Sequence, residues 1–263
     1  MFGLSKNERL TDAVLNGKGT KAIELIRKGA KPEAIAMEYA VAHRNEVWII
    51  QLLGAGAAAT PELLHSAMLW DKPETAKALI AAGATPRQDT LEWIIDKGRG
   101  TDQVKILLDG GATPTPEMLY DAVHAENQPL AKVLVAKGAV PDEELLYHAV
   151  YSLDTDWVDM LLEAGAKPTP AMLFTAVFTR ENRSMTRAIL AKGVVPDEET
   201  LEFAVSGMDA EWVQMLLDAG GRPTSAMLFN AVYYEEPLKA EALVAAGAVP
   251  DEDTIDTARD RGP

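Results

Sequence analysis

The chain repeats one stretch of fourteen residues, which reads "KGAVPDEELLYHAV" at 137–150 and "KGVVPDEETLEFAV" at 192–205. A third version, "AGAKPTPAMLFTAV", lies between them at 164–177. The glycine of this stretch recurs along the chain at an interval of 27 or 28 residues. Its nine positions are 29, 56, 83, 111, 138, 165, 193, 220 and 247. Self-similarity at a fixed short period is the signature of a repeat protein.

Four other positions keep their residue type at a fixed distance from this repeat glycine. Proline follows it by three residues, except at Ala59, and Leu, Met or Ile follows it by eight. Alanine follows it by eleven residues, except at Ile94. An aliphatic pair such as Leu161 and Leu162 precedes it by four and three residues. Apolar residues at these spacings share one face of an α-helix, so the columns predict helices.

Each repeat is predicted to contain two short helices. In one form of the repeat, Thr115 is a good N-cap and Pro116 suits the first helical position, whereas in the other form Asp142 is the cap. A short break follows, and a second helix begins at "NQP" (127–129) in the unit that starts at Gly111. It ends near the next repeat glycine, which can take the left-handed conformation that ends helices. The alternation typical of strands is absent.

The predicted fold is therefore all-α: an α-solenoid of about nine stacked helix-turn-helix units, curved along its length. Each copy covers the apolar face of its neighbour, and the terminal units differ because they have one neighbour only. We expect an N-terminal capping helix pair at 1–28 and a C-terminal half-repeat cap at 247–263, with a polar character. The repeat array between them spans 29–246, with units that start near 29, 56, 83, 111, 138, 165, 193 and 220.

The repeat resembles that of the ankyrin family. The stretch "TPEMLYDAVHAENQPLAKVLVAKGA" (115–139) follows the ankyrin order of Thr-Pro, inner helix, outer helix with paired aliphatics, and Gly-Ala, and "TPELLHSAM" (60–68) is the best short match. Each unit is about six residues shorter than the 33 of ankyrin. The missing residues belong to the β-hairpin finger, so this finger is not expected here. Ankyrin-like proteins usually bind partners through the fingers and the inner-helix groove, and the resemblance implies that this chain retains the groove alone.

Composition limits the classes of function. The chain has 263 residues, a net charge of −15 and no cysteine, which excludes disulfides, thiolate metal sites and thiol nucleophiles. Residues 1–50 carry a net charge of +2 and residues 201–263 a net charge of −8. This gradient argues against direct nucleic-acid binding, which needs clustered Lys and Arg. It suits a partner protein with a basic patch, or simple solubility. We expect a cytoplasmic protein that binds no membrane, since no apolar stretch approaches a span and no secretory signal is apparent.

The sequence contains no motif that indicates catalysis, a metal or a cofactor. The four histidines, at 43, 65, 124 and 148, occupy different repeat columns and recur with no carboxylate partner. The segment "NGKGTK" (16–21) lacks the first glycine of a phosphate loop and follows no buried strand. The two glycines of "DKGRGTDQ" (96–103) fit a bend, a local contact site or a drifted loop. We therefore expect a non-enzymatic protein without cofactors.

Aromatic residues are the main signal for a binding surface. They recur nine and thirteen residues after the repeat glycine, which places them four apart on the first helix. Lateral packing between first helices and a concave partner-binding groove both explain this pattern. Under the second explanation, at least two of the rings in the units that start at Gly138 and Gly165 are exposed in the isolated chain. The candidate partner-binding residues are Tyr120, His124, Tyr147, His148, Tyr151, Phe174, Phe178, Phe229, Tyr233 and Tyr234.

Three functions agree with these features. The first is a protein–protein interaction scaffold that binds through the concave face of the first helices. The second is a structural or adaptor subunit of a larger assembly, which uses its edges and ends as contacts. The third is an acidic decoy that inhibits a nucleic-acid-binding protein, and such a complex would be sensitive to salt.

Overall fold

Every regular element in the part of the chain that the computed structural model describes, residues 4–179 and 182–260, is an α-helix. These residues form 19 helices of nine or ten residues each. They divide into two compact units, Met1–Ala139 and Val140–Pro263. The predicted all-α helical repeat is thus confirmed.

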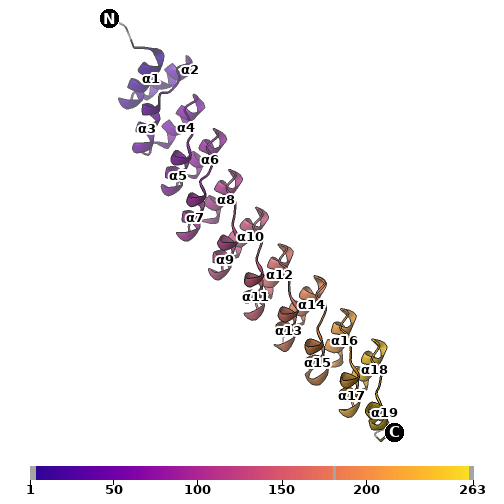
Figure 1. Ribbon diagram of the computed structural model, residues 1–263. Helices are drawn as coiled ribbons and strands as arrows, with labels where there is room; N and C mark the ends of the chain where they lie inside the picture. Colours follow the sequence, from indigo (N-terminus) through magenta and orange to yellow (C-terminus); the bar gives the residue numbers. More distant parts are fainter. Residues whose placement is uncertain (1–3, 180–181, 261–263) are drawn as a thin grey trace. The chain divides into compact units, whose positions relative to one another are not determined.

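The first unit contains five helix pairs (Figure 1). Odd-numbered helices are the first helices of their repeats and even-numbered helices are the second. Their bounds are α1 (Lys6–Leu15), α2 (Gly19–Arg27), α3 (Ala34–Ala42), α4 (Glu46–Gly54), α5 (Pro61–Leu69), α6 (Pro73–Ala81), α7 (Gln88–Asp96), α8 (Thr101–Asp109), α9 (Pro116–His124) and α10 (Gln128–Ala136).

The second unit contains four pairs and a single last helix. The first helices α11, α13, α15, α17 and α19 pack in one row, and the second helices lie beside it, with α12 against α14 and α16 against α18 (Figure 1). The bounds are α11 (Glu143–Tyr151), α12 (Thr155–Glu163), α13 (Pro170–Phe178), α14 (Arg183–Ala191), α15 (Glu198–Gly207), α16 (Ala210–Asp218), α17 (Ser225–Tyr233), α18 (Pro237–Ala245) and α19 (Glu252–Asp260).

Local side-chain caps begin the helices where the sequence predicts them. The hydroxyl of Thr115 accepts a hydrogen bond from the backbone N–H of Met118, and Pro116 is the first residue of α9. The carboxylate of Asp142 accepts from the N–H of Leu145 at the start of α11, at 2.8 Å. Each cap satisfies a backbone donor that has no partner inside the helix. Both predicted caps are confirmed.

Left-handed backbone occurs in the turns that follow the second helices and in several of those that precede them. The repeat glycines have positive φ, for example 98° at Gly165, which is the conformation expected for them. In five of the turns within a helix pair, a residue other than glycine adopts positive φ, with values between 50° and 59°. They are Arg44, Asp71, Glu126, Leu153 and Glu235. Side chains make this region unfavourable, so these turns carry local strain.

The repeat columns form the core of each unit. In α9, Leu119 and Ala122 are buried, and in α12 Trp157, Leu161 and Leu162 are buried. The segment 164–169 between α12 and α13 contains no strand, and no strand occurs anywhere in residues 4–179 and 182–260. The β-hairpin finger of ankyrin is therefore missing from the described residues, as the repeat length predicts.

The two terminal segments differ from the other repeats. Helix α1 begins with a capping box, in which the Ser5 hydroxyl accepts from the N–H of Glu8 and the Glu8 carboxylate accepts from the N–H of Ser5. Helix α19 carries acidic residues in its first turn. It also exposes Ile255 and Ala258, which occupy positions that are core positions in the other repeats. The last helix is therefore not simply a polar cap. Among the described helices, none is long and apolar enough to cross a membrane.

Candidate functional site

Aromatic side chains stack in pairs on three first helices of the second unit. The two members of a pair are four residues apart, so they project from successive turns of the same helix. The pairs and the distances between their ring centroids are Tyr147–Tyr151 on α11 at 6.2 Å, Phe174–Phe178 on α13 at 5.8 Å and Phe229–Tyr233 on α17 at 5.8 Å.

Many of these rings are open to solvent. The exposed fraction is 44% for Tyr147, 68% for Tyr151 and 57% for Phe178, while Phe174 is half-buried. The expectation that at least two of these four rings are exposed in the isolated chain is confirmed. Next to the third pair, Tyr234 is exposed as well and meets Tyr233 edge-on, with 5.2 Å between their centroids.

Lateral packing accounts for another part of the pattern. Phe203 of α15 lies 6.0 Å from Phe174 and 5.2 Å from Phe178 of the neighbouring helix α13, measured between ring centroids. Edge-on and tilted contacts at these distances are favourable for aromatic rings. Lateral packing therefore accounts for some rings of this row, while others of the same row are exposed.

We call the exposed rings of the second unit the aromatic face. It consists of Tyr147, Tyr151, Phe178, Tyr233 and Tyr234. Phe174 and Phe229 are half-buried and stack on their exposed partners, and His148 is exposed on α11. The structure thus brings these eight candidate residues onto one row of first helices.

Two candidates, Tyr120 and His124, belong to the first unit. They lie on α9 with their ring centroids 4.0 Å apart, and Tyr120 is half-buried while His124 is exposed. Their stacking follows the same spacing of four residues. The boundary at 139/140 separates them from the aromatic face.

The sequence reasoning missed aromatic residues on other first helices of the first unit. Tyr39 stacks on His43 with 3.9 Å between centroids. The half-buried ring of Trp70 lies at the end of α5, and that of Trp93 lies on α7. All four occupy columns ten or fourteen residues after the repeat glycine, one position later than those considered. Inspection of the columns ten and fourteen residues after the repeat glycine would have identified these residues.

In the first unit two of these rings are covered by arginine. The guanidinium carbon of Arg44 lies 5.2 Å from the ring centroid of Trp70, and that of Arg99 lies 5.2 Å from Trp93. These are cation–π contacts, which help to hold the turns in place. The irregular segment 96–103 therefore makes a local contact through Arg99. Arg99 lies between Gly98, which has a left-handed backbone, and Gly100, which is the N-cap of α8.

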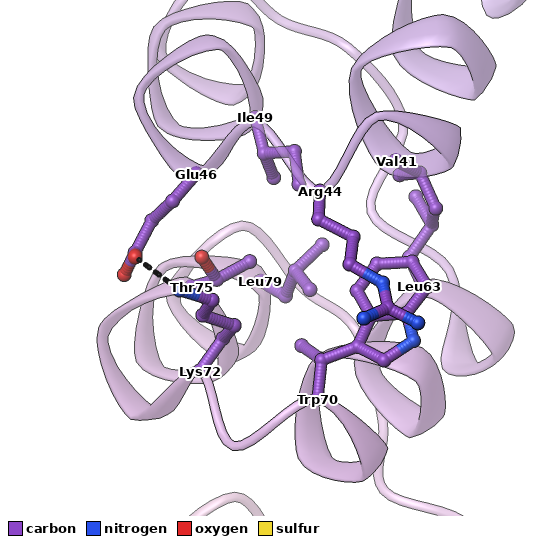
Figure 2. A pocket seen from close by; sticks show the side chains of 10 residues that line it. Val41, Arg44, Glu46, Ile49, Leu63, Trp70, Lys72, Thr75 and Leu79 are labelled. Atoms are coloured by element: carbon purple, nitrogen blue, oxygen red, sulfur yellow. Dashed lines mark ion pairs between the residues drawn. The ribbon is translucent and has the colours of Figure 1, made fainter.

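Figure 2 shows the cavity beside Arg44 and Trp70. Lys72 and Glu46 form an ion pair at its other side, with 3.5 Å between Nζ and Oε2. The cavity volume is about 10 Å³, which corresponds to a single water molecule rather than a ligand. The buried hydroxyl of Thr75 lines it and has no hydrogen-bond partner within the described part of the chain. A single bridging water would fit this place.

The two units differ in net charge. The second unit, residues 140–263, holds nine Lys and Arg against twenty-three Asp and Glu, a net charge of −14. The first unit, residues 1–139, holds sixteen against seventeen, a net charge of −1. Almost the entire acidity of the chain therefore lies in the unit that carries the aromatic face.

Two of the histidines make local contacts within the first unit. Nδ1 of His65 lies 2.8 Å from the hydroxyl of Thr90, and Nδ1 of His43 lies 2.9 Å from the carbonyl oxygen of Tyr39. Among residues 4–179 and 182–260, no cluster of three or more His, Asp or Glu side chains is suited to a metal ion.

Comparisons with known proteins add a weak structural similarity. No protein-family model matches the chain, and no curated protein matches it either. One solved structure that it resembles is described as a circular tandem repeat protein with novel repeat topology and enhanced subunit contact surfaces. The identity is 13% and the TM-score 0.12, over 98% of this chain. This chain spans 59% of the length of that structure. At this TM-score the similarity supports no argument about function.

Proposed function

We propose that the chain is a non-enzymatic scaffold that binds another protein through the first helices of its second unit. The observation that carries the proposal is the aromatic face, where Tyr151 and Tyr234 are each about two-thirds exposed, at 68% and 67%. A helix row that needed lateral packing alone would place leucine or alanine at these positions. Exposed tyrosine and phenylalanine side chains are the residue types that most often anchor protein interfaces.

Charge supports a basic partner. The aromatic face lies in a unit with a net charge of −14, so a positively charged surface would be attracted to it at long range. Binding would then join an apolar centre to an acidic margin. The half-buried Phe174 and Phe229 and the exposed His148 would take part in the same surface. Tyr120 and His124 would form a second contact in the first unit.

The repeat itself is proposed to be a short ankyrin-like unit that lacks the finger. The Thr-Pro starts of α5 and α9, with Thr60 and Thr115 as N-caps, support this relationship. In such a unit the first helices provide the binding groove, and the aromatic face lies on these helices.

The test compares two double variants. A Tyr151→Ala/Phe178→Ala chain and the unaltered chain are used to capture partners from the native host, and the affinity of the captured protein is then measured. We expect a loss of about 2 kcal/mol or more, roughly a 30-fold weaker Kd, because both rings are exposed anchors. The matched control is Val47→Ala/Leu238→Ala, which removes two exposed apolar side chains from second helices and should leave affinity unchanged.

Three results would contradict the proposal or reassign the function. Equal affinity with both rings removed would show that the aromatic face is not the contact. Capture that is lost equally in the control would indicate non-specific apolar binding. A complex that dissociates in moderate salt and in the presence of DNA or RNA would favour the acidic decoy instead.

A further inference from the structure

A column of aromatic residues is interrupted on the first helices of the first unit. The position ten residues after the repeat glycine is Tyr39 in α3 and Trp93 in α7, but it is Ser66 in α5, the first helix between them. The corresponding residue of α15 is Phe203, and its ring packs against the aromatic pair of the preceding first helix, α13. A serine at this position leaves free the space that an aromatic ring takes between two first helices.

A cavity of about 630 Å³ lies between α3 and α5, beside Ser66. We call it the α3–α5 pocket, and its lining includes Met37, Glu38 and Val41 of α3 and Glu62, Leu63 and Ser66 of α5. Helices α13 and α15 pack against each other, whereas α3 and α5 make little direct contact. Small-molecule sites in proteins have volumes of about 300–1,000 Å³, so this pocket is large enough for an organic ligand.

The apolar part of the lining offers a surface for a ring. Met37 is buried, and Val41 and Leu63 are half-buried. Val41 and Leu63 also line the much smaller cavity drawn in Figure 2, so the two cavities are neighbours. Three glutamates complete the chemistry of the α3–α5 pocket, and its described lining contains no Lys, Arg or His. The pocket is therefore apolar and negatively charged.

One of the three carboxylates has no partner in the protein. Glu33 accepts a hydrogen bond of 2.8 Å from the hydroxyl of Thr11, and Glu62 lies 3.9 Å from Arg87. Hydrogen bonds from its own backbone N–H and from a threonine hydroxyl hold the pKa of the Glu62 carboxyl below its usual value. The exposed Glu38 makes no hydrogen bond or ion pair within the described residues, so its carboxylate can face a ligand.

Comparison with another repeat indicates what fits the pocket. Between α13 and α15, Phe203 packs against Phe174, and in the α3–α5 pocket Ser66 and Glu38 occupy the corresponding positions. A ligand that restores this packing brings a ring for the place of Phe203 and a positive charge for Glu38. We infer that the pocket binds a small aromatic amine, with its ring between α3 and α5 and its ammonium group beside Glu38.

A second position also makes room in this repeat. Ala58 lines the pocket, and it lies two residues after the repeat glycine. The other eight repeats have a larger residue at this position, such as Thr85, Val140 or Val195. A valine at 58 should therefore be compatible with the fold and should reduce the space for a ligand.

The experiment titrates the full chain with tryptamine and follows the backbone amides by nuclear magnetic resonance. We expect saturable shifts in α3, α5 and the segment 56–60, with a Kd of about 1 mM or tighter, which is reasonable for a ligand of this size. Two matched probes separate the contributions of ring and charge. Indole-3-propionate has the same ring with a carboxylate, and n-butylamine has the ammonium group without a ring. Each should bind at least about tenfold more weakly than tryptamine.

Variants of the chain test the same contacts. Ser66→Phe places a ring in the pocket, as Phe203 does between α13 and α15, and should weaken tryptamine binding at least about tenfold. Glu38→Gln removes the charge at nearly constant size and should weaken it at least about threefold. The matched control is Glu92→Gln, at the same repeat position of α7 but outside the pocket, and it should leave the Kd unchanged.

Several results would overturn the inference. These are no saturable shifts with tryptamine, equal binding of either matched probe, or equal weakening by Glu92→Gln. Unchanged binding to Ser66→Phe would also overturn it, and circular dichroism shows whether this variant is folded. If it is not, Ala58→Val takes its place and should weaken binding at least about threefold. No residue of the pocket belongs to the aromatic face, so the Tyr151→Ala/Phe178→Ala chain should bind tryptamine normally, whatever the outcome for the proposed function.

Discussion

Removal of one buried side chain from α12 should cause a large but local loss of stability. Leu161 is fully buried, and replacing it with alanine removes three carbon atoms from the core of the second unit. At about 0.8 kcal/mol for each buried methylene, the transfer term alone is about 2.4 kcal/mol. The cavity that remains adds to this term, so the expected total lies within about 2–5 kcal/mol.

The location of this loss tests the repeat architecture. In a stack of repeats each unit depends mainly on its neighbours, so hydrogen exchange should accelerate most in α11, α12, α13 and α14. Amides of α17, α18 and α19 should change little. The control is Leu238→Ala, the same chemical change at an exposed position of α18, which should cost less than about 0.5 kcal/mol. A loss for Leu161→Ala below 1 kcal/mol, or uniform acceleration over the whole second unit, would refute the reasoning.

Two further predictions concern a strained turn and the last helix. Glu126→Gly should raise the free energy of unfolding by about 0.5–1 kcal/mol, because Glu126 has a φ of 51°, which glycine adopts without strain. The control Ala125→Gly, at a φ of −82°, should lower the free energy of unfolding by a similar amount. Denaturant titration measures both variants, and equal effects on stability would contradict the presence of strain at Glu126. Hydrogen bonds from the hydroxyl and backbone N–H of Thr254 hold the pKa of Asp251 below its usual value, so their contribution to α19 is present above about pH 4 and is lost as the pH falls through the lowered pKa. Amide exchange in α19 should therefore accelerate in acid for the unaltered chain and much less for Asp251→Asn, and the same acid response in both would contradict this role.

The helix boundaries could be predicted because the interactions that set them are local. Thr115 and Asp142 bond to backbone groups three residues ahead, so a few residues of sequence contain the whole cap. The repeat glycines act in the same way, through the backbone conformation of one residue. Burial of the columns that include Leu119 and Ala122 could also be predicted, because each repeat in the interior of a stack has the same neighbours.

Tertiary structure decided what depends on a particular neighbour. Phe203 packs against Phe174 and Phe178 because α13 and α15 are adjacent. Tyr151 occupies the same position in its repeat as Phe178 and is 68% exposed. The contact between Arg99 and Trp93 likewise depends on the conformation of the turn that joins α7 and α8.

The exposure of Ile255 on α19 also depends on its neighbours in the fold. Ile255 belongs by sequence to a column that is buried in every earlier repeat, and the periodicity alone predicts a core residue there. Burial is a property of two packed surfaces, and among the described residues nothing packs on this side of α19. The sequence by itself determined the helices and their apolar faces. Only the tertiary structure decided which of those faces are covered, because covering requires a second helix that the local sequence does not specify.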